Sequence, residues 1–151
     1  MEQRSLKELR DRLVSLRVRE EDTLAQVVAK VLDQPGHSEI CVVDGGGKLL
    51  GVIRIKTLFR TLFFHHAEPT LMTRQLLELA SPETAGHLMV TDPAVAREDD
   101  TLDDAIRTMV QRRLGELPVV DAQRRLLGSV AMKHVFALWL ERQRGQGEGQ
   151  G

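Results

Sequence analysis

The chain has 151 residues, of which 42% are hydrophobic and 28% charged, and its formal net charge is −1. This length supports one compact domain, or two small halves that share a core. The near-zero charge and the 3% aromatic content argue against a nucleic-acid or membrane partner. A single cysteine excludes an internal disulfide framework, and no apolar signal region or membrane-spanning run is present. The expected compartment is therefore the cytoplasm.

The first half predicts the order strand, helix, strand, strand, helix. Thr23 and Gln26 form a helix-capping pattern, and the apolar residues behind them follow the i, i+3, i+4, i+7, i+8 spacing of a buried stripe. That stripe consists of Leu24, Val27, Val28, Val31 and Leu32. The strands are expected at residues 16–18, 40–43 and 49–53, the last two as a hairpin, and the closing helix at 58–63.

The second half repeats these elements in order. Thr23 aligns with Thr101 at an offset of 78 residues, and Asp44 aligns with Asp121 at an offset of 77 after a one-residue gap. The second helical stripe consists of Leu102, Ala105, Ile106, Met109 and Val110. Its strands are expected at 94–96, 117–120 and 126–130, and its closing helix at 135–140. The chain is thus predicted to be one βαββα unit used twice.

One unit of roughly 50 residues would bury too little apolar surface to offset its conformational entropy. We therefore expect an α/β (α+β) fold in which the two units pack sheet to sheet about a pseudo-two-fold axis. Along the chain this gives a helical lead-in at 1–12, a first repeat at 13–64 and a helical connector at 65–88. A second repeat at 89–142 and a disordered Gly/Gln/Glu-rich tail at 143–151 complete the division.

These landmarks resemble a tandem pair of cystathionine β-synthase (CBS) domains, often called a Bateman module. The second repeat carries the resemblance best, in the run HLMVTDPAVAREDDTLDDAIRTMVQRRLGELPVVDAQRRLLGSVAMKHV. The first repeat keeps the same landmarks in REEDTLAQVVAKVLDQPGHSEICVVDGGGKLLGVIRIKTL. The resemblance implies a binding module that takes AMP, ADP, ATP or S-adenosylmethionine in the cleft between repeats, forms homodimers, and regulates a partner protein.

In this family, nucleotide binding usually goes with a glycine, two apolar residues, a Ser or Thr, two free positions and an Asp. The hydroxyl contacts phosphate, and the carboxylate accepts hydrogen bonds from both ribose hydroxyls. Here Arg54 and Ala131 occupy the hydroxyl position, and Thr57 and His134 occupy the carboxylate position. We expect Arg54 to contact phosphate and Thr57 or His134 to bond a ribose. The candidate ligand-binding residues are Arg54, Lys56, Thr57, Pro118, Ala131, Lys133 and His134.

The sequence thus favours a regulatory, adenosine-ligand sensor that works as a homodimer, with the amphipathic closing helices as the dimer surface. The absent Ser/Thr and Asp leave a second hypothesis open, an interaction module that has no nucleotide ligand. A regulatory fragment of a longer enzyme or transporter is a third. No nucleophile–base arrangement indicates catalysis, so no enzyme activity, no required cofactor and no metal are expected, and the regulated partner is unknown.

Overall fold

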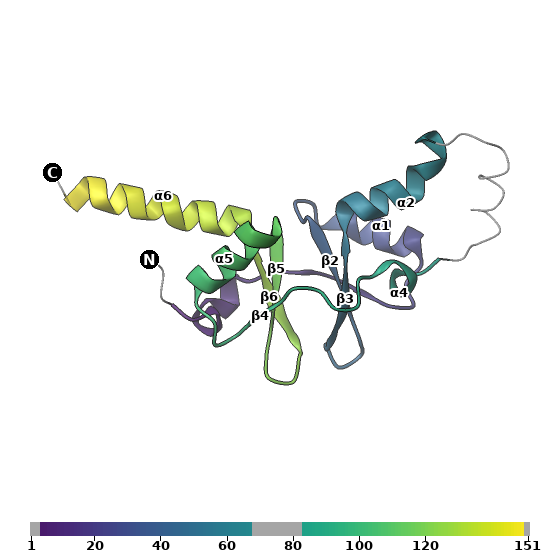
Figure 1. Ribbon diagram of the computed structural model, residues 1–151, viewed down its shortest axis with the longest axis horizontal. Helices are drawn as coiled ribbons and strands as arrows, with labels where there is room; N and C mark the ends of the chain where they lie inside the picture. The colour runs from purple at the N-terminus through teal and green to yellow at the C-terminus, as the bar shows by residue number, and fades with distance from the viewer. Residues whose placement is uncertain (1–3, 68–82, 150–151) are drawn as a thin grey trace. The chain divides into compact units, whose positions relative to one another are not determined.

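The structure is a computed structural model that describes residues 4–67 and 83–149. The chain forms two compact units (Figure 1). The first-repeat unit comprises Ser15–Pro93 together with Gln123–Leu126. The second-repeat unit comprises Met1–Val14, Ala94–Ala122 and Leu127–Gly151.

The first-repeat unit contains one three-stranded sheet in the order β1-β2-β3. Strands β1 and β2 are parallel, and β2 and β3 are antiparallel with an irregularity between Val42 and Val43. The elements of this unit are β1 (Leu16–Arg19), α1 (Leu24–Asp33), β2 (Glu39–Val43), β3 (Leu49–Arg54), α2 (Ile55–Ala67) and α4 (Ala85–Leu88).

The second-repeat unit contains a matching sheet in the order β4-β5-β6, and its β4 and β5 are parallel. Its elements are a 3-10 helix η1 (Leu6–Arg12), β4 (Ala96–Arg97), α5 (Leu102–Arg112), β5 (Glu116–Val120), β6 (Leu126–Ala131) and α6 (Met132–Gly149). The doubled βαββα order predicted from the sequence is therefore confirmed.

Each first helix of a repeat begins at a complete capping box, as the sequence predicts. Thr23 Oγ1 accepts a hydrogen bond from Gln26 N at 3.2 Å, and Gln26 Oε1 accepts one from Thr23 N at 2.9 Å. Thr101 and Asp104 make the same reciprocal pair at 3.2 and 3.1 Å. These bonds satisfy N–H groups that the first turn of a helix leaves without intrahelical partners.

Each unit has its own apolar core. The buried core residues of the first-repeat unit are Leu16, Val18, Val27, Ile40, Val42, Ile53, Leu58 and Ala85. Those of the second-repeat unit are Leu6, Leu9, Leu13, Ala96, Leu102, Ala105, Met109, Leu114, Leu117, Val119 and Val130. The predicted stripes are wrong at their last position, because Leu32 is 75% exposed and Val110 is 72% exposed. Periodicity predicts which side of a helix is apolar, but it does not predict how much of that side the rest of the unit covers.

The segments that precede the repeats are exchanged between the two units. Helix η1 belongs to the second-repeat unit, where Leu6 N and Lys7 N donate to Asp100 O and Glu98 O at 2.8 and 2.9 Å. Helix α4 belongs to the first-repeat unit, and Ala85 N donates to Asp22 O at 2.9 Å. The predicted boundaries 13–64 and 89–142 follow chain order, whereas the compact units do not.

Residues 68–82 of the predicted helical connector, 65–88, lie outside the described residues. The tail was expected to be disordered from residue 143, but α6 continues to Gly149. Helix extension adds one hydrogen bond for each residue fixed, so a helix nucleated at Met132 can propagate through exposed Arg and Gln residues despite its glycines.

Candidate functional site

The candidate residues of the first repeat lie where β3 passes into α2. Arg54 is the last residue of β3 and is exposed, Lys56 is exposed in the first turn of α2, and Thr57 is half-buried there. Ile55 N donates a hydrogen bond to Ser38 O at 3.0 Å, which fixes the start of α2 to the residue before β2. The three predicted residues are therefore brought together at one strand-to-helix junction.

The second repeat builds the equivalent junction between β6 and α6. Ala131 ends β6 and is 7% exposed, while Lys133 is exposed and His134 half-buried in the first turn of α6. Met132 N donates to Gly115 O at 3.1 Å, the counterpart of the bond in the first repeat. Pro118 lies apart from these residues in the middle of β5, with its side chain fully buried. The role of all seven residues in ligand binding stays a prediction.

His134 helps to cap its own helix. Its Nδ1 accepts a long hydrogen bond, 3.4 Å, from the backbone N–H of Ala131, the residue before α6. This bond uses one of the two ring nitrogens as an acceptor, so a single imidazole cannot accept hydrogen bonds from two ribose hydroxyls as a carboxylate does.

Two buried carboxylates at these junctions are not among the residues predicted from the sequence. Glu39 is the first residue of β2 and is 7% exposed, and Glu116 is the first residue of β5 and is 3% exposed. Glu39 is the cross-strand partner of Arg54. The two glutamates align at the offset of 77 that the hairpins share, so the repeat alignment contained the signal that marks them.

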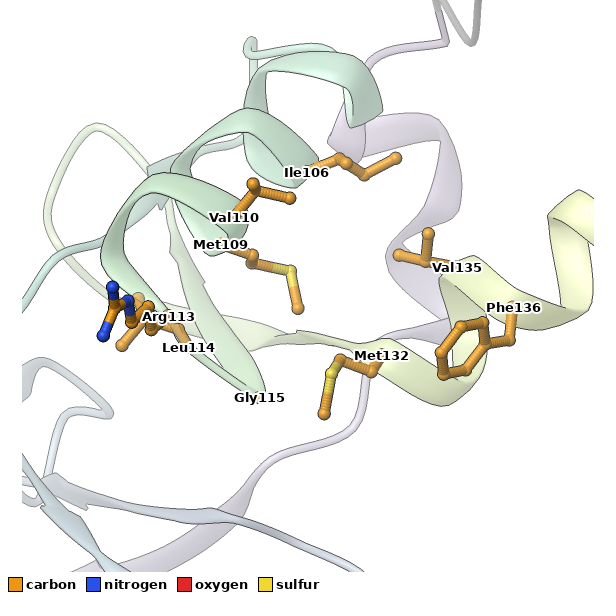
Figure 2. Close-up of a pocket in the computed structure, with 9 residues that line it drawn as sticks. All are labelled: Ile106, Met109, Val110, Arg113, Leu114, Gly115, Met132, Val135 and Phe136. Atoms are coloured by element: carbon orange, nitrogen blue, oxygen red, sulfur yellow. The ribbon is translucent and has the colours of Figure 1, made fainter.

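A separate apolar groove of about 460 Å³ lies between α5 and α6 in the second-repeat unit. Figure 2 shows Met109 and Val110 of α5 and Met132 and Phe136 of α6 around this groove, with Arg113 at one end. Several large apolar side chains on the closing helices are exposed. They are Phe59 and Phe63 on α2, and Met132, Phe136, Trp139 and Leu140 on α6. Both closing helices thus present apolar surface, as the amphipathic pattern predicts.

Within residues 4–67 and 83–149, no group of three or more His, Cys, Asp or Glu side chains is arranged to hold a metal ion. In the same part of the chain, no helix combines the length and the apolarity needed to cross a bilayer.

A model of the CBS domain matches the chain twice, at residues 7–63 and 85–141, and so covers more than half of it. No curated protein matches the sequence. Among solved structures, CBSX2 of Arabidopsis thaliana in complex with AMP matches with a TM-score of 0.72 at 21% identity, over 92% of this chain and 98% of that chain.

Two other solved structures share the fold. The CBS domain pair of protein MJ0100, in complex with 5′-methylthioadenosine and S-adenosyl-L-methionine, gives a TM-score of 0.70 at 18% identity, over 93% of this chain and 98% of that chain. The cytosolic domain of the Mg²⁺ channel MgtE, in complex with ATP, gives 0.61 at 26% identity, over 82% of this chain and 44% of that chain. The mixed α+β architecture with two three-stranded sheets is thus shared with these CBS-pair structures.

Proposed function

The chain belongs to the CBS domain family, with one copy of the domain in each repeat, and from this premise we propose that it is a regulatory module that senses an adenosine-containing ligand. The observation that carries the proposal is the chemistry shared by its structural relatives. CBSX2, MJ0100 and MgtE are complexed with AMP, with 5′-methylthioadenosine and S-adenosylmethionine, and with ATP. Each of these ligands contains adenosine, so AMP, ADP, ATP and S-adenosylmethionine are the candidate ligands of this chain.

The strand-to-helix junctions support this proposal through their charges. Arg54 and Lys56 are exposed at the first junction, and Lys133 is exposed at the second. Exposed cations beside a helix start attract phosphate, since the charge and the helix N-terminus both favour an anion. Thr57 and the Nε2 of His134 can donate hydrogen bonds to ribose oxygens. Each junction therefore carries groups for the phosphate and for the ribose of a nucleotide.

A thermal-shift panel of AMP, ADP, ATP and S-adenosylmethionine tests the proposal. A ligand present at 100 times its Kd adds about 2.7 kcal/mol to the free energy of unfolding, which raises Tm by several degrees. The Lys56→Ala and Lys133→Ala variants should weaken the binding of AMP or ATP about tenfold by calorimetry. Lys30→Ala, an exposed lysine on α1, is the matched control and should bind like the wild type. No shift with any of the four ligands at millimolar concentration would reject the proposal.

A second candidate function is an interaction module without a nucleotide ligand. The observation that favours it is specific: Ala131 offers no hydroxyl, and His134 uses Nδ1 to cap α6. Under this alternative, none of the four ligands shifts the Tm of the wild type. Each lysine variant likewise keeps its own Tm when nucleotide is added. Saturable binding that the lysine variants weaken would exclude it.

We further propose that the chain acts as a homodimer whose second copy covers the exposed apolar side chains of α2 and α6. Exposed large apolar side chains that gather on one helix face are typical of an association surface. In the second-repeat unit, the groove between α5 and α6 adds concave apolar surface beside the exposed side chains of α6. A dimer would give ligand binding a route to a regulated protein, through a change in the geometry of the pair.

A further inference from the structure

The exposed face of α2 carries two aromatic rings and two cations. Lys56, Phe59, Arg60 and Phe63 follow the i, i+3, i+4, i+7 spacing of one helix face, and all four are exposed. The rings of Phe59 and Phe63 contact each other, with their centroids 5.0 Å apart and their planes tilted by 47°. Since these side chains are 65% and 45% exposed, an aromatic pair protrudes from the first-repeat unit.

The second-repeat unit carries a groove beside its closing helix. The groove lies between α5 and α6 and has a volume of about 460 Å³. Ile106 and Val110 line it on the α5 side, and Met132 and Phe136 line it on the α6 side (Figure 2). Apolar side chains that an occupant removes from water contribute free energy in proportion to the area covered. The groove is therefore shaped and lined to hold an apolar projection.

The charges beside these two surfaces have opposite signs. Helix α2 contains Lys56 and Arg60 and no Asp or Glu. Asp103 lies in the first turn of α5, three residues before Ile106, and residues at this spacing are neighbours on a helix face. Arg113 lies at the other end of the groove. The cations of α2 are thus attracted toward the start of α5 and repelled from its end.

Two unlike surfaces of this kind pair better than two identical ones. If α2 packed against α2 of a second copy, the cations Lys56 and Arg60 of both copies would meet without any acid, and close like charges repel. If two grooves met, two concave surfaces would enclose space that protein packing does not leave unfilled. An α2 face against a groove avoids both costs, because the rings fill the groove while the cations approach Asp103.

We propose that α2 of one copy binds in the groove between α5 and α6 of a second copy, with Phe59 and Phe63 inserted between the two helices. This inference rests on the homodimer of the proposed function, and it assigns the surfaces that meet. In a pair with two-fold symmetry each copy gives its α2 to the other, so the contact is made twice. The first repeat of each copy then contacts the second repeat of its partner, which is a head-to-tail arrangement.

Complementation between two variants tests the arrangement. Phe59→Asp places a charge on the face of α2 that enters the groove, and Val110→Lys places a cation in the groove, where it repels Lys56 and Arg60. In a head-to-tail pair, each variant damages both contacts of its own homodimer. Both variants should therefore sediment as monomers at micromolar concentration.

An equimolar mixture of the two variants should dimerise again. Each hybrid pair has one contact between an unaltered α2 and an unaltered groove, and in its other contact the new aspartate meets the new lysine. The mixture should therefore form dimers at a concentration about tenfold or more below that needed by either variant alone. Gln111→Lys is the matched control, exposed on α5 outside the groove, and should dimerise like the wild type.

A pair that joins identical surfaces gives the opposite result. Each contact of the hybrid would then contain one altered surface, so the mixture would dimerise no more tightly than the separate variants. That result would overturn this inference and leave the homodimer standing. A monomeric wild type would overturn both the inference and the homodimer, whereas the nucleotide panel tests ligand binding independently. The Tm of each variant, measured alongside, shows that a change in sedimentation does not come from unfolding.

Discussion

Val52 and Val90 exchange two backbone hydrogen bonds, 3.1 Å from Val52 N to Val90 O and 2.8 Å in the opposite direction. The bonds bring the segment after α4 against β3 within the first-repeat unit. A Cβ atom on the neighbouring Gly51 would lie 2.5 Å from Val90 O, a distance that real Cβ atoms do not show. In the second-repeat unit, a Cβ atom on Gly128 would lie 2.5 Å from Leu13 O. The two glycines, which align at an offset of 77, therefore leave room for the segment after α4 and for the segment after η1 to pack against β3 and β6.

We predict that Gly51→Ala and Gly128→Ala each destabilise the protein. The added methyl group must displace backbone, and overpacking of this kind costs about 1–3 kcal/mol. Chemical denaturation should show a lower midpoint for both variants. The control is Gly145→Ala on α6, where nothing lies within 4 Å of the new Cβ atom. Alanine is the better helix former, so this variant should be as stable as the wild type or slightly more so. Equal stability of all three variants would show that the segments around Val90 and Leu13 can move away from the added methyl groups.

The repeated elements could be predicted from the sequence because their signals are local. Caps such as Thr23 and Thr101, apolar alternation and turn residues act within a few residues of one another. The exchange of η1 and α4 between the units could not be predicted, since it depends on backbone contacts between segments far apart in the sequence. The sequence shows a glycine in each Leu-Leu-Gly run, but it does not show that Val90 and Leu13 pack too closely against these positions for a side chain to fit.

We predict that Thr101→Ala lowers the free energy of unfolding by about 1 kcal/mol, the usual effect of losing a capping hydroxyl. The variant removes the acceptor of Asp104 N, which lies 3.2 Å from Thr101 Oγ1. Thr101→Ser should retain most of the stability, because serine offers the same acceptor. Urea denaturation of the three proteins measures the difference. Equal midpoints for the alanine and serine variants would mean that the cap contributes nothing.

The same capping box predicts a dependence of stability on acid. The backbone N–H of Thr101, followed by its hydroxyl and by Arg107, holds the pKa of Asp104 below its ordinary value of 3.8. A carboxyl whose folded-state pKa is lowered stabilises the fold when ionised. That contribution is complete above the ordinary pKa and is lost as the pH falls through the lower, folded-state pKa. In Asp104→Asn this part of the acid dependence should disappear, so denaturation midpoints measured from pH 5 to pH 2 should fall less steeply than in the wild type. An unchanged slope would contradict the assignment.

Arg113 gives a prediction of increased stability. It follows α5 in the left-handed region, at φ 57° and ψ 49°, where a non-glycine residue costs roughly 1 kcal/mol. The first repeat has a glycine, Gly36 at φ 97°, after its own first helix. Arg113→Gly should therefore raise Tm by a few degrees. Arg112→Gly, one residue earlier and inside the helix, should lower the stability by about 1 kcal/mol. A lower Tm for Arg113→Gly would mean that the guanidinium contributes more than the backbone strain costs.

The candidate site was predictable in part. The sequence located both strand-to-helix junctions, because the family pattern begins at a glycine three positions before Arg54 and three positions before Ala131. The alignment pairs Glu39 with Glu116, but it did not show that they are buried, because a pattern read along one segment contains no information about the neighbouring strand. Cross-strand register supplies that link, as the pairing of Glu39 with Arg54 shows.

The exposed closing helices give the last prediction, that the protein is a homodimer at micromolar concentration. Phe59 and Phe136 are 65% and 68% exposed at equivalent positions of α2 and α6. An aspartate placed in an apolar interface would be buried without a partner, so Phe59→Asp and Phe136→Asp should each shift sedimentation from dimer toward monomer. Gln143→Asp introduces the same charge at an exposed polar position of α6 and should remain dimeric. A wild-type monomer in sedimentation would reject the dimer. A wild-type dimer that both phenylalanine variants preserve would place its interface elsewhere on the chain.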